Sequence, residues 1–183
     1  MADAHPPCID QALIARASAV VRRLKQQSLG IVTAESCTAG LVSAVLSQAE
    51  GAGDVLHGSF VTYTKANKTI ALGVSAALLA SRGSVNEDVA RALARGALQR
   101  SPADLALAIT GVLGPEPDDD GNPVGLIFFA CCHRGGDPIV MRRDYGDKPH
   151  DELRRIAVLE ALALIEFCAS GSRENLSASA NVR

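Results

Sequence analysis

Hydrophobic positions along the chain alternate between helical spacing and short continuous runs. Residues 9–24 carry apolar side chains at helical intervals, which predicts a helix that ends at residues 28–30, where a glycine can terminate it. Residues 31–34 form an apolar run typical of a short buried strand. A second apolar helix is predicted over residues 38–48, so this part of the chain is a strand, loop and helix unit.

The middle of the chain continues the alternation of strands and helices. We expect a strand over residues 55–63 and short helical pieces as far as residue 82. Ser84 and Glu87 have the spacing of a capping box and predict the start of a helix that runs to about residue 100. Residues 105–109 have no polar face, which is typical of a central strand covered on both sides.

The last third of the chain predicts a hairpin and a long helix. Two strand-like runs at residues 124–133 and 139–145 are joined by a short turn, and residues 150–169 have one apolar face. These elements predict an α/β fold, a three-layer α/β/α sandwich around a mixed, mostly parallel sheet. We expect one domain over residues 8–169 and a flexible polar tail over residues 170–183.

Composition narrows the classes of function. The net charge is −2, and 2 Tyr, 4 Phe and no Trp offer few stacking platforms, so direct nucleic-acid binding is not expected. No run of about 18 apolar residues and no signal-like start are present, which favours a cytoplasmic protein without a membrane span. The five cysteines and four histidines lack metal-ligand spacing, so we predict no metal and interpret most cysteines as buried apolar residues.

Three polar clusters follow apolar strands, at residues 33–38, 63–68 and 110–115. Ser36, in the first cluster, has two interpretations. It could cap the following helix together with Thr38, as serine and threonine often do. It could instead be a nucleophile, which would need an adjacent base, and no histidine lies in a recognisable triad motif.

A lysine in the second cluster could be that base. Lys65 and Lys68 are the candidates. A lysine acts as a base near pH 7 only if its pKa falls by roughly three units, a change of about 4 kcal/mol that burial in apolar surroundings can supply. The alternative is that both are solvated surface cations.

The three clusters together resemble one known family. The octapeptide at residues 33–40 (TAESCTAG), the segment from Tyr63 to Lys68, and the Thr-Gly-x-x-Gly-Pro run at residues 110–115 are similar to motifs of the CinA carboxy-terminal-domain family. The similarity covers residues 12–165, and the family includes nicotinamide-nucleotide amidohydrolases. It implies hydrolysis of nicotinamide mononucleotide to nicotinic acid mononucleotide and ammonia by a homo-oligomer without any cofactor.

The resemblance also assigns roles to individual residues. Ser36 would be the nucleophile, Lys68 the general base that returns a proton to the leaving ammonia, and Tyr63 a hydrogen-bonding assistant. Backbone N–H groups of Cys37 and Thr38 are candidate donors to the developing oxyanion. Cys37 is the rival nucleophile, because a helix start can lower the pKa of a thiol.

Further residues are candidates for substrate contact. Thr110, Gly111 and Gly114 form a turn of small residues where the backbone can approach a ribose or a phosphate. Lys148 stands where the family usually has an arginine and is the candidate cation for a phosphate group.

The chain departs from the family in the loop at residues 116–122. That loop is acidic here and lacks the family's Lys-Pro ending. This change keeps two alternatives open. One is a non-catalytic nucleotide-binding or competence-associated interaction module of the same fold. The other is an amidase for an unphosphorylated substrate, because three adjacent aspartates repel phosphate if they face the pocket.

Overall fold

The computed structural model describes residues 9–170, in which five strands form one sheet in the order β2-β1-β3-β4-β5. The strands are β1 (Ile31–Glu35), β2 (Leu56–Val61), β3 (Leu105–Gly111), β4 (Leu126–His133) and β5 (Ile139–Asp144). β1 pairs in parallel with β2 and β3, whereas β4 is antiparallel to β3 and β5. The sheet is mixed as predicted. Two of the four neighbouring strand pairs are parallel and two are antiparallel. Both antiparallel pairs contain β4, which is the one strand of the five that runs opposite to the others.

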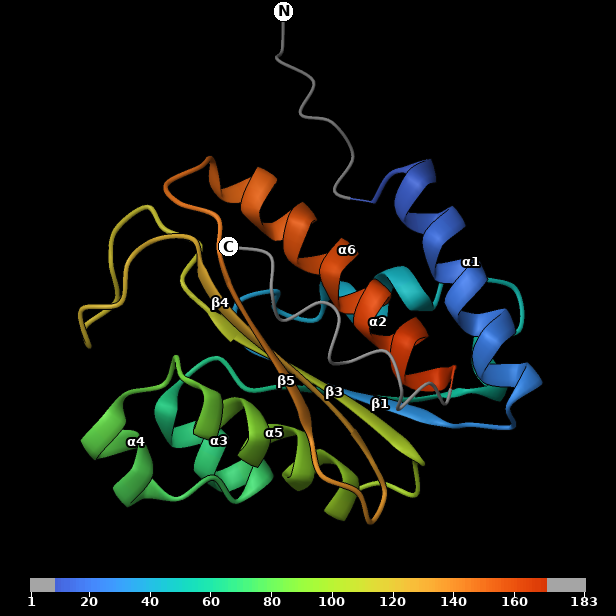
Figure 1. The fold of residues 1–183 in the computed structure, drawn as a ribbon, viewed down its shortest axis with the longest axis horizontal. Helices are drawn as coiled ribbons and strands as arrows, with labels where there is room; N and C mark the ends of the chain where they lie inside the picture. The colour runs from blue at the N-terminus through green and yellow to red at the C-terminus, as the bar shows by residue number, and fades with distance from the viewer. Residues whose placement is uncertain (1–8, 171–183) are drawn as a thin grey trace, which may run out of the picture.

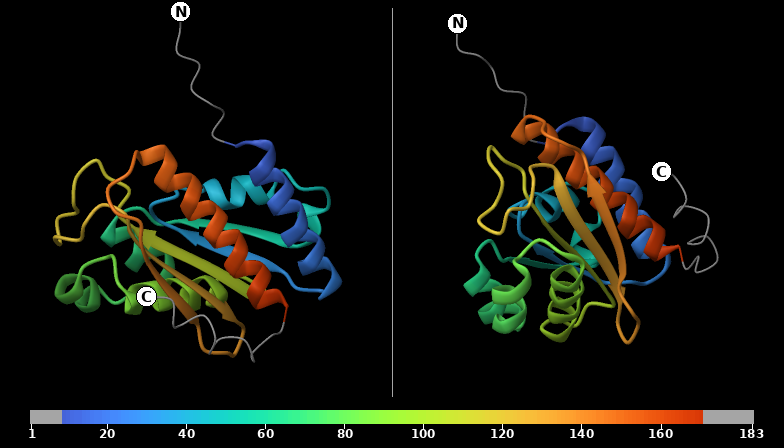
Figure 2. Two further views of the ribbon diagram at one scale, coloured as in Figure 1. Left: turned by 45° about the horizontal axis from the view of Figure 1, so that its top comes forward. Right: turned by 60° about the vertical axis from the view of Figure 1, so that its left-hand side comes forward.

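Helices cover both faces of this sheet. Figures 1 and 2 show α1, α2 and α6 on one side and α3, α4 and α5 on the other. Their bounds are α1 (Gln11–Gln26), α2 (Leu41–Leu46), α3 (Lys65–Leu72), α4 (Ala76–Arg82), α5 (Glu87–Gln99) and α6 (His150–Ala169), with a 3-10 turn η1 (Ala52–Asp54). The three-layer α/β/α arrangement is therefore confirmed.

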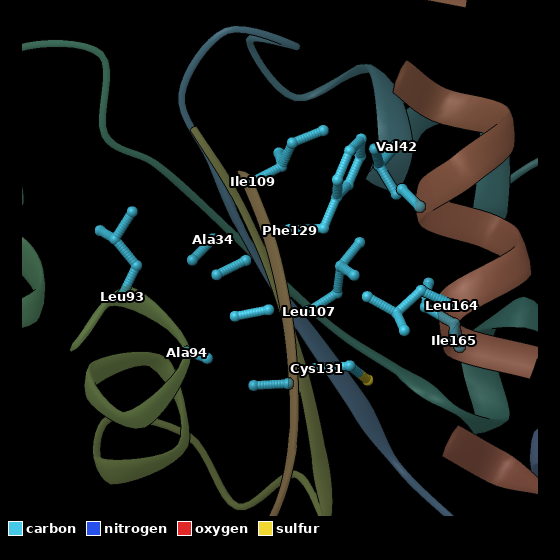
Figure 3. Close-up of a cluster of buried hydrophobic side chains, with 14 of the residues drawn as sticks. Ala34, Val42, Leu93, Ala94, Leu107, Ile109, Phe129, Cys131, Leu164 and Ile165 are labelled. Atoms are coloured by element: carbon cyan, nitrogen blue, oxygen red, sulfur yellow. The ribbon is translucent and has the colours of Figure 1, made fainter. Parts of the chain in front are cut away.

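The core lies on both faces of the central strand β3. Figure 3 shows Leu107, Ile109 and Phe129 turned toward α2 and α6, with Leu93 and Ala94 of α5 on the opposite face. All five side chains are completely buried. Alanines alternate with the large residues along β3, and their short side chains let α5 pack close to the sheet. The prediction of a central strand without a polar face is confirmed.

Helix boundaries are where the sequence predictions were wrong. The helix expected over residues 38–48 is only Leu41–Leu46, because Ala39 and Gly40 have φ angles of 51° and 92° that no right-handed helix can contain. α1 ends at Gln26, and Ser28 rather than a glycine takes the left-handed conformation there.

The capping box predicted for the next helix is also wrong. The side chain of Asn86, not that of Ser84, accepts the hydrogen bond from the Val89 N–H at the start of α5. Glu87 pairs with Arg91 one turn along the helix instead of reaching back. Asparagine is as good a helix cap as serine, so the signal was present in the sequence two residues later.

The predicted hairpin of β4 and β5 and the long last helix are confirmed. The polar tail predicted for residues 170–183 lies, apart from Ser170, outside the described residues. Within residues 9–170, no helix combines the length and the hydropathy that a membrane crossing requires.

The topology brings three loops to one edge of the sheet. β1, β2 and β3 run in the same direction, so the residues after Glu35, Val61 and Gly111 emerge side by side. Two of these loops lead into α2 and α3, and the third is the acidic loop that joins β3 to β4. Parallel strands commonly place their functional residues at this edge.

Candidate active site

Ser36 is held in a tight loop between β1 and α2. Its backbone N–H donates to the carbonyl of Ile109 on the neighbouring strand at 3.1 Å, and only 7% of the residue is exposed. The N-cap of α2 is Gly40, which has no side-chain cap. The interpretation of Ser36 and Thr38 as helix caps is therefore wrong, and the Ser36 hydroxyl is available for another task.

Glu35 organises the loop that carries Ser36. Its buried carboxylate accepts hydrogen bonds from the Thr38 hydroxyl at 2.7 Å and from the backbone N–H groups of Val42 at 3.0 Å and Ser43 at 2.9 Å. These bonds satisfy free donors at the start of α2 and tie the loop to β1. Sequence reasoning missed this role, although a carboxylate that ends an apolar strand next to Ser36 was a usable signal.

Lys68 reaches the site from α3. The helix starts at a cap formed by Thr64, whose hydroxyl accepts from the Asn67 N–H at 3.1 Å. Lys68 and Leu72 lie one turn apart and form the buried face of this helix. Lys68 is only 1% exposed, so the alternative that it is a solvated surface cation is wrong.

The Lys68 amine and the Ser36 hydroxyl are in direct contact. Lys68 Nζ donates to Ser36 Oγ at 2.8 Å, to the Thr62 carbonyl at 2.7 Å and to the Tyr63 carbonyl at 3.3 Å. A protonated amine can donate to all three oxygens. A neutral amine has two hydrogens for the two carbonyls and directs its lone pair at Ser36, which is the geometry of a base facing a nucleophile.

Burial lowers the pKa of Lys68 from 10.5 to about 8. No carboxylate among the described residues bonds to this amine and offsets the loss of hydration. With a pKa near 8, about one molecule in ten carries a neutral Lys68 at pH 7. Lys65 differs, because its exposed amine pairs with Asp120 at 2.5 Å. Of the two candidate lysines, the structure brings only Lys68 to Ser36.

Cys37 lies beside Ser36 but is a poor nucleophile. Burial raises the pKa of the Cys37 thiol to about 12, and the nearby Lys68 charge lowers it only in part. The side chain is therefore a thiol and not a thiolate at neutral pH. The chemistry of this loop favours the hydroxyl of Ser36 over the sulfur.

A cavity of about 470 Å³ opens in front of Ser36. Cys37, Tyr63, Gly111 and Gly114 also line it, as predicted for a substrate site. Lys65, the other candidate base, lines it as well, and so do polar and charged residues that sequence reasoning did not assign as substrate contacts, namely Ser84, Glu116, Asp118, Asp119, Asp120 and His150. The acidic loop at residues 116–122, in which the sequence differs from the family motif, therefore forms part of the wall of this cavity.

Three predicted contact residues do not line the cavity. The hydroxyl of Thr38 donates to Glu35, and that of Thr110 donates to the Ser84 carbonyl at 2.9 Å. Lys148 pairs with Glu152 at 2.9 Å on the first turn of α6. The two threonines have structural partners, and the structure does not bring Lys148 to the cavity.

Tyr63 meets the pair through its backbone. Its carbonyl accepts from Lys68, whereas the residue is 69% exposed and its phenol makes no hydrogen bond to Ser36 or Lys68. Within residues 9–170, no three His, Cys, Asp or Glu side chains are grouped as metal ligands. The site therefore centres on one hydroxyl and one buried amine.

The model of the CinA C-terminal domain matches residues 14–169. The chain belongs to this family. Among curated relatives, this CinA domain is 39% identical over 145 residues to a CinA-like protein of Geobacter sulfurreducens and 42% identical over 148 residues to one of Anaeromyxobacter dehalogenans. These alignments cover 79% and 81% of the chain but only 35% and 36% of the relatives, so the chain spans about a third of their length.

Solved structures of the family share the fold. The competence/damage inducible protein CihA from Agrobacterium tumefaciens superposes with a TM-score of 0.83 at 33% identity, over 88% of this CinA domain and 98% of that chain. A competence-damaged protein (CinA) superfamily protein from Escherichia coli gives 0.80 at 34% identity, over 87% and 93%. The resemblance inferred from the three motifs is confirmed at the level of the family.

Proposed function

We propose that this CinA domain is an amidohydrolase that converts nicotinamide mononucleotide to nicotinic acid mononucleotide and ammonia. The observation that carries the proposal is the 2.8 Å contact between a buried Lys68 amine and the Ser36 hydroxyl at the floor of a cavity. Keeping a lysine amine away from water lowers its pKa toward neutrality, and such a group suits proton transfer.

The first half of the reaction is acylation of Ser36. Neutral Lys68 takes the hydroxyl proton as Ser36 Oγ bonds to the carboxamide carbon, and the carbonyl oxygen becomes an oxyanion. Backbone N–H groups of Cys37 and Thr38 donate to no oxygen acceptor among the described residues. Their recorded partner is the Cys37 sulfur, a weak acceptor, and we assign them as the donors to that oxyanion.

The second half releases the two products. The Lys68 ammonium gives its proton to the departing nitrogen as the C–N bond breaks, so ammonia leaves and an ester to Ser36 remains. Lys68, neutral again, takes a proton from water, which attacks the ester. Lys68 returns the proton to Ser36 Oγ as the ester bond breaks, and the carboxylic acid product leaves and ionises to the carboxylate, its proton passing to ammonia or to solvent. One water molecule is consumed, and no electron is transferred.

Ammonia release from nicotinamide mononucleotide by the purified protein tests the proposal. We expect turnover in the native protein, its loss in Ser36→Ala and Lys68→Ala, and retention of most activity in Cys37→Ala. The exposed Lys25 offers a control, because Lys25→Ala also removes a lysine amine but leaves the site intact. Full activity in Ser36→Ala would refute the assignment of the nucleophile.

The acidic loop supports a second candidate function, a binding module of the same fold without turnover. Four carboxylates line the cavity of this CinA domain, and they oppose the productive placement of a phosphate-bearing substrate against Ser36, which disfavours turnover of the mononucleotide. The same assay separates the two functions. A native protein that binds the mononucleotide in calorimetry but releases no ammonia from any nicotinamide compound would be the module.

A further inference from the structure

The lining of the cavity carries a strong negative charge. Four carboxylates line it, Glu116, Asp118, Asp119 and Asp120, against a single lysine, Lys65. Their formal sum is −3 with His150 neutral. Because Ser36 fixes where a carboxamide must react, the remainder of any substrate extends through a cavity whose charged lining consists of these groups.

Among the described residues that line the cavity, no unpaired lysine or arginine is left for a phosphate. Lys65 Nζ is bound to Asp120 at 2.5 Å, and Lys148 pairs with Glu152 away from the cavity. Arg154 lies behind the lining, where its Nη2 is 3.4 Å from the His150 ring. A phosphate in the cavity would therefore face carboxylates before it met an unpaired cation.

The acidic loop is held in place over the site. The Asp118 carboxylate accepts from the Asn122 N–H at 2.8 Å and closes the turn. Asp120 bridges Lys65 at the start of α3 and the Ser84 N–H at 3.2 Å. These bonds hold the acidic side chains of the loop at the cavity.

Glu116 and Asp119 have a different role from their neighbours. They have no hydrogen bond or ion pair to any residue among 9–170, and both are exposed at the cavity. Nothing in the described structure neutralises them. A charged molecule bound in the cavity would therefore interact with two carboxylates that have no counter-ion among the described residues.

We propose that these carboxylates make the site selective for a carboxamide on a cationic ring that carries no phosphate, such as nicotinamide riboside. The selectivity rests on the proposed amidohydrolase reaction at Ser36 and Lys68 and revises its preferred substrate, because the mononucleotide would react with a lower kcat/KM than the riboside. In the riboside, the ring nitrogen bonded to ribose makes a pyridinium cation, which the carboxylates attract. The mononucleotide adds a phosphate with about two negative charges, which they repel.

Steady-state ammonia release from riboside, mononucleotide and free nicotinamide tests the selectivity. The native protein should have a higher kcat/KM for the riboside than for the other two. In Glu116→Gln/Asp119→Asn, the ratio of riboside to mononucleotide should fall about tenfold at low ionic strength. Added salt should lower the ratio in the native protein and much less in the variant.

A matched control removes two carboxylates far from the cavity. Glu50→Gln/Asp137→Asn has the same change in net charge, and Asp137 lies in the turn at the opposite end of the sheet. The ratio should stay at its native value there. An equal fall in both double variants would overturn the proposal, because it would then report total charge.

Other outcomes separate this selectivity from the amidohydrolase function. A native preference for the mononucleotide that is lost in Arg154→Met would overturn the selectivity and leave the reaction standing. If no compound releases ammonia, the proposed reaction fails, and calorimetric binding decides the selectivity. Tighter binding of riboside than of mononucleotide, reduced in Glu116→Gln/Asp119→Asn, would uphold it, and any other binding result would overturn it.

Discussion

Each end of the sheet has a cavity and a lysine beside it, Lys25 in the lining of one cavity and Lys68 bonded to Ser36 in the lining of the other, and the two lysines are in opposite electrostatic situations. At the amino ends of β1, β2 and β3, a cavity of about 390 Å³ is lined by Lys25, Asp54, His57 and Asp104. Lys25 donates to Asp54 at 2.6 Å, and that carboxylate raises the lysine pKa above 10.5. At the carboxyl ends, Lys68 is buried against carbonyls and a hydroxyl, and its pKa is lowered to about 8.

The difference shows what converts a lysine into a base. A carboxylate partner and bulk water both favour the charged form, and Lys25 has both. Lys68 has neither, so burial favours its neutral form. A cavity and a lysine are therefore not enough. The proposed chemistry at Ser36 depends on a lysine to which the fold gives no carboxylate counter-ion.

The largest expected contrast is in activity. Lys68→Met keeps an unbranched side chain as far as its ε position and removes the amine, and we expect ammonia release to fall about 10³-fold, within the range for loss of a general base. Lys25→Met, the same substitution at the other end of the sheet, should leave the rate unchanged. Comparable losses in both variants would show that Lys68 acts through stability and not through proton transfer.

The next contrast is in stability against pH. The unfolded chain holds the Lys68 proton up to pH of about 10.5, but the folded chain releases it near 8. Between these values the unfolded state binds more protons, so the free energy of unfolding rises with pH. Below pH 8, burial of the charged amine destabilises the fold by its full amount.

Urea denaturation from pH 7 to 10.5 measures this term. Relative to Lys68→Met, the native protein should gain up to about 3 kcal/mol across the window. Subtracting the Lys68→Met curve cancels the titration of other groups. Parallel curves for the two proteins would mean that Lys68 is solvated in the folded state.

A smaller effect on activity is expected from Glu35, which positions the loop that carries Ser36 and takes no part in proton transfer. Glu35→Gln replaces one carboxylate oxygen by an NH₂ group, which turns a donor toward the N–H of Val42 or Ser43. We expect a loss of about 2 kcal/mol in stability and a fall in kcat with little change in KM. The exposed Glu50, changed to Gln, is the control. Native kcat in Glu35→Gln would show that the loop holds Ser36 without this carboxylate.

The arrangement of the sheet could be predicted because its signals are local. The apolar run at residues 105–109 and the short turn between β4 and β5 each report on neighbouring residues, and both predictions are confirmed. Helix starts were less predictable, since the left-handed Ala39 has no sequence signature of its own and its conformation depends on the bonds that Glu35 makes.

The candidate site was predictable only through the three motifs taken together. Nothing in the spacing of Ser36 and Lys68, 32 residues apart, indicates a 2.8 Å contact, which arises because β1 and β2 pair in parallel. The Lys65–Asp120 pair, 55 residues apart, had no signal either. The cavity wall is made of loops that are far apart in the sequence, so its acidic lining could be identified only from the three-dimensional structure.

The smallest expected effect is obtained by giving Lys68 the kind of partner that Lys25 already has. The Cys37 side chain lies close enough to Lys68 for an electrostatic interaction, so Cys37→Asp places a carboxylate beside the buried amine. That carboxylate favours the ammonium form of Lys68 and raises the lysine pKa.

In the native protein, kcat/KM should rise with pH through an apparent pKa of about 8, because only neutral Lys68 accepts the serine proton. In Cys37→Asp this midpoint should move up by about one unit, with activity at pH 7 about tenfold lower and the alkaline plateau retained.

Cys37→Asn separates charge from shape, because it has the size of the aspartate variant without its charge. Circular dichroism of both variants checks that the loop still folds around the new polar group. A native midpoint in Cys37→Asn together with an alkaline shift in Cys37→Asp would mean that the pKa of the base follows its counter-ion, as the two ends of the sheet indicate. Equal midpoints in the two variants would mean that the rise of kcat/KM with pH reports the titration of another group. The assignment of Lys68 as the base would then be refuted.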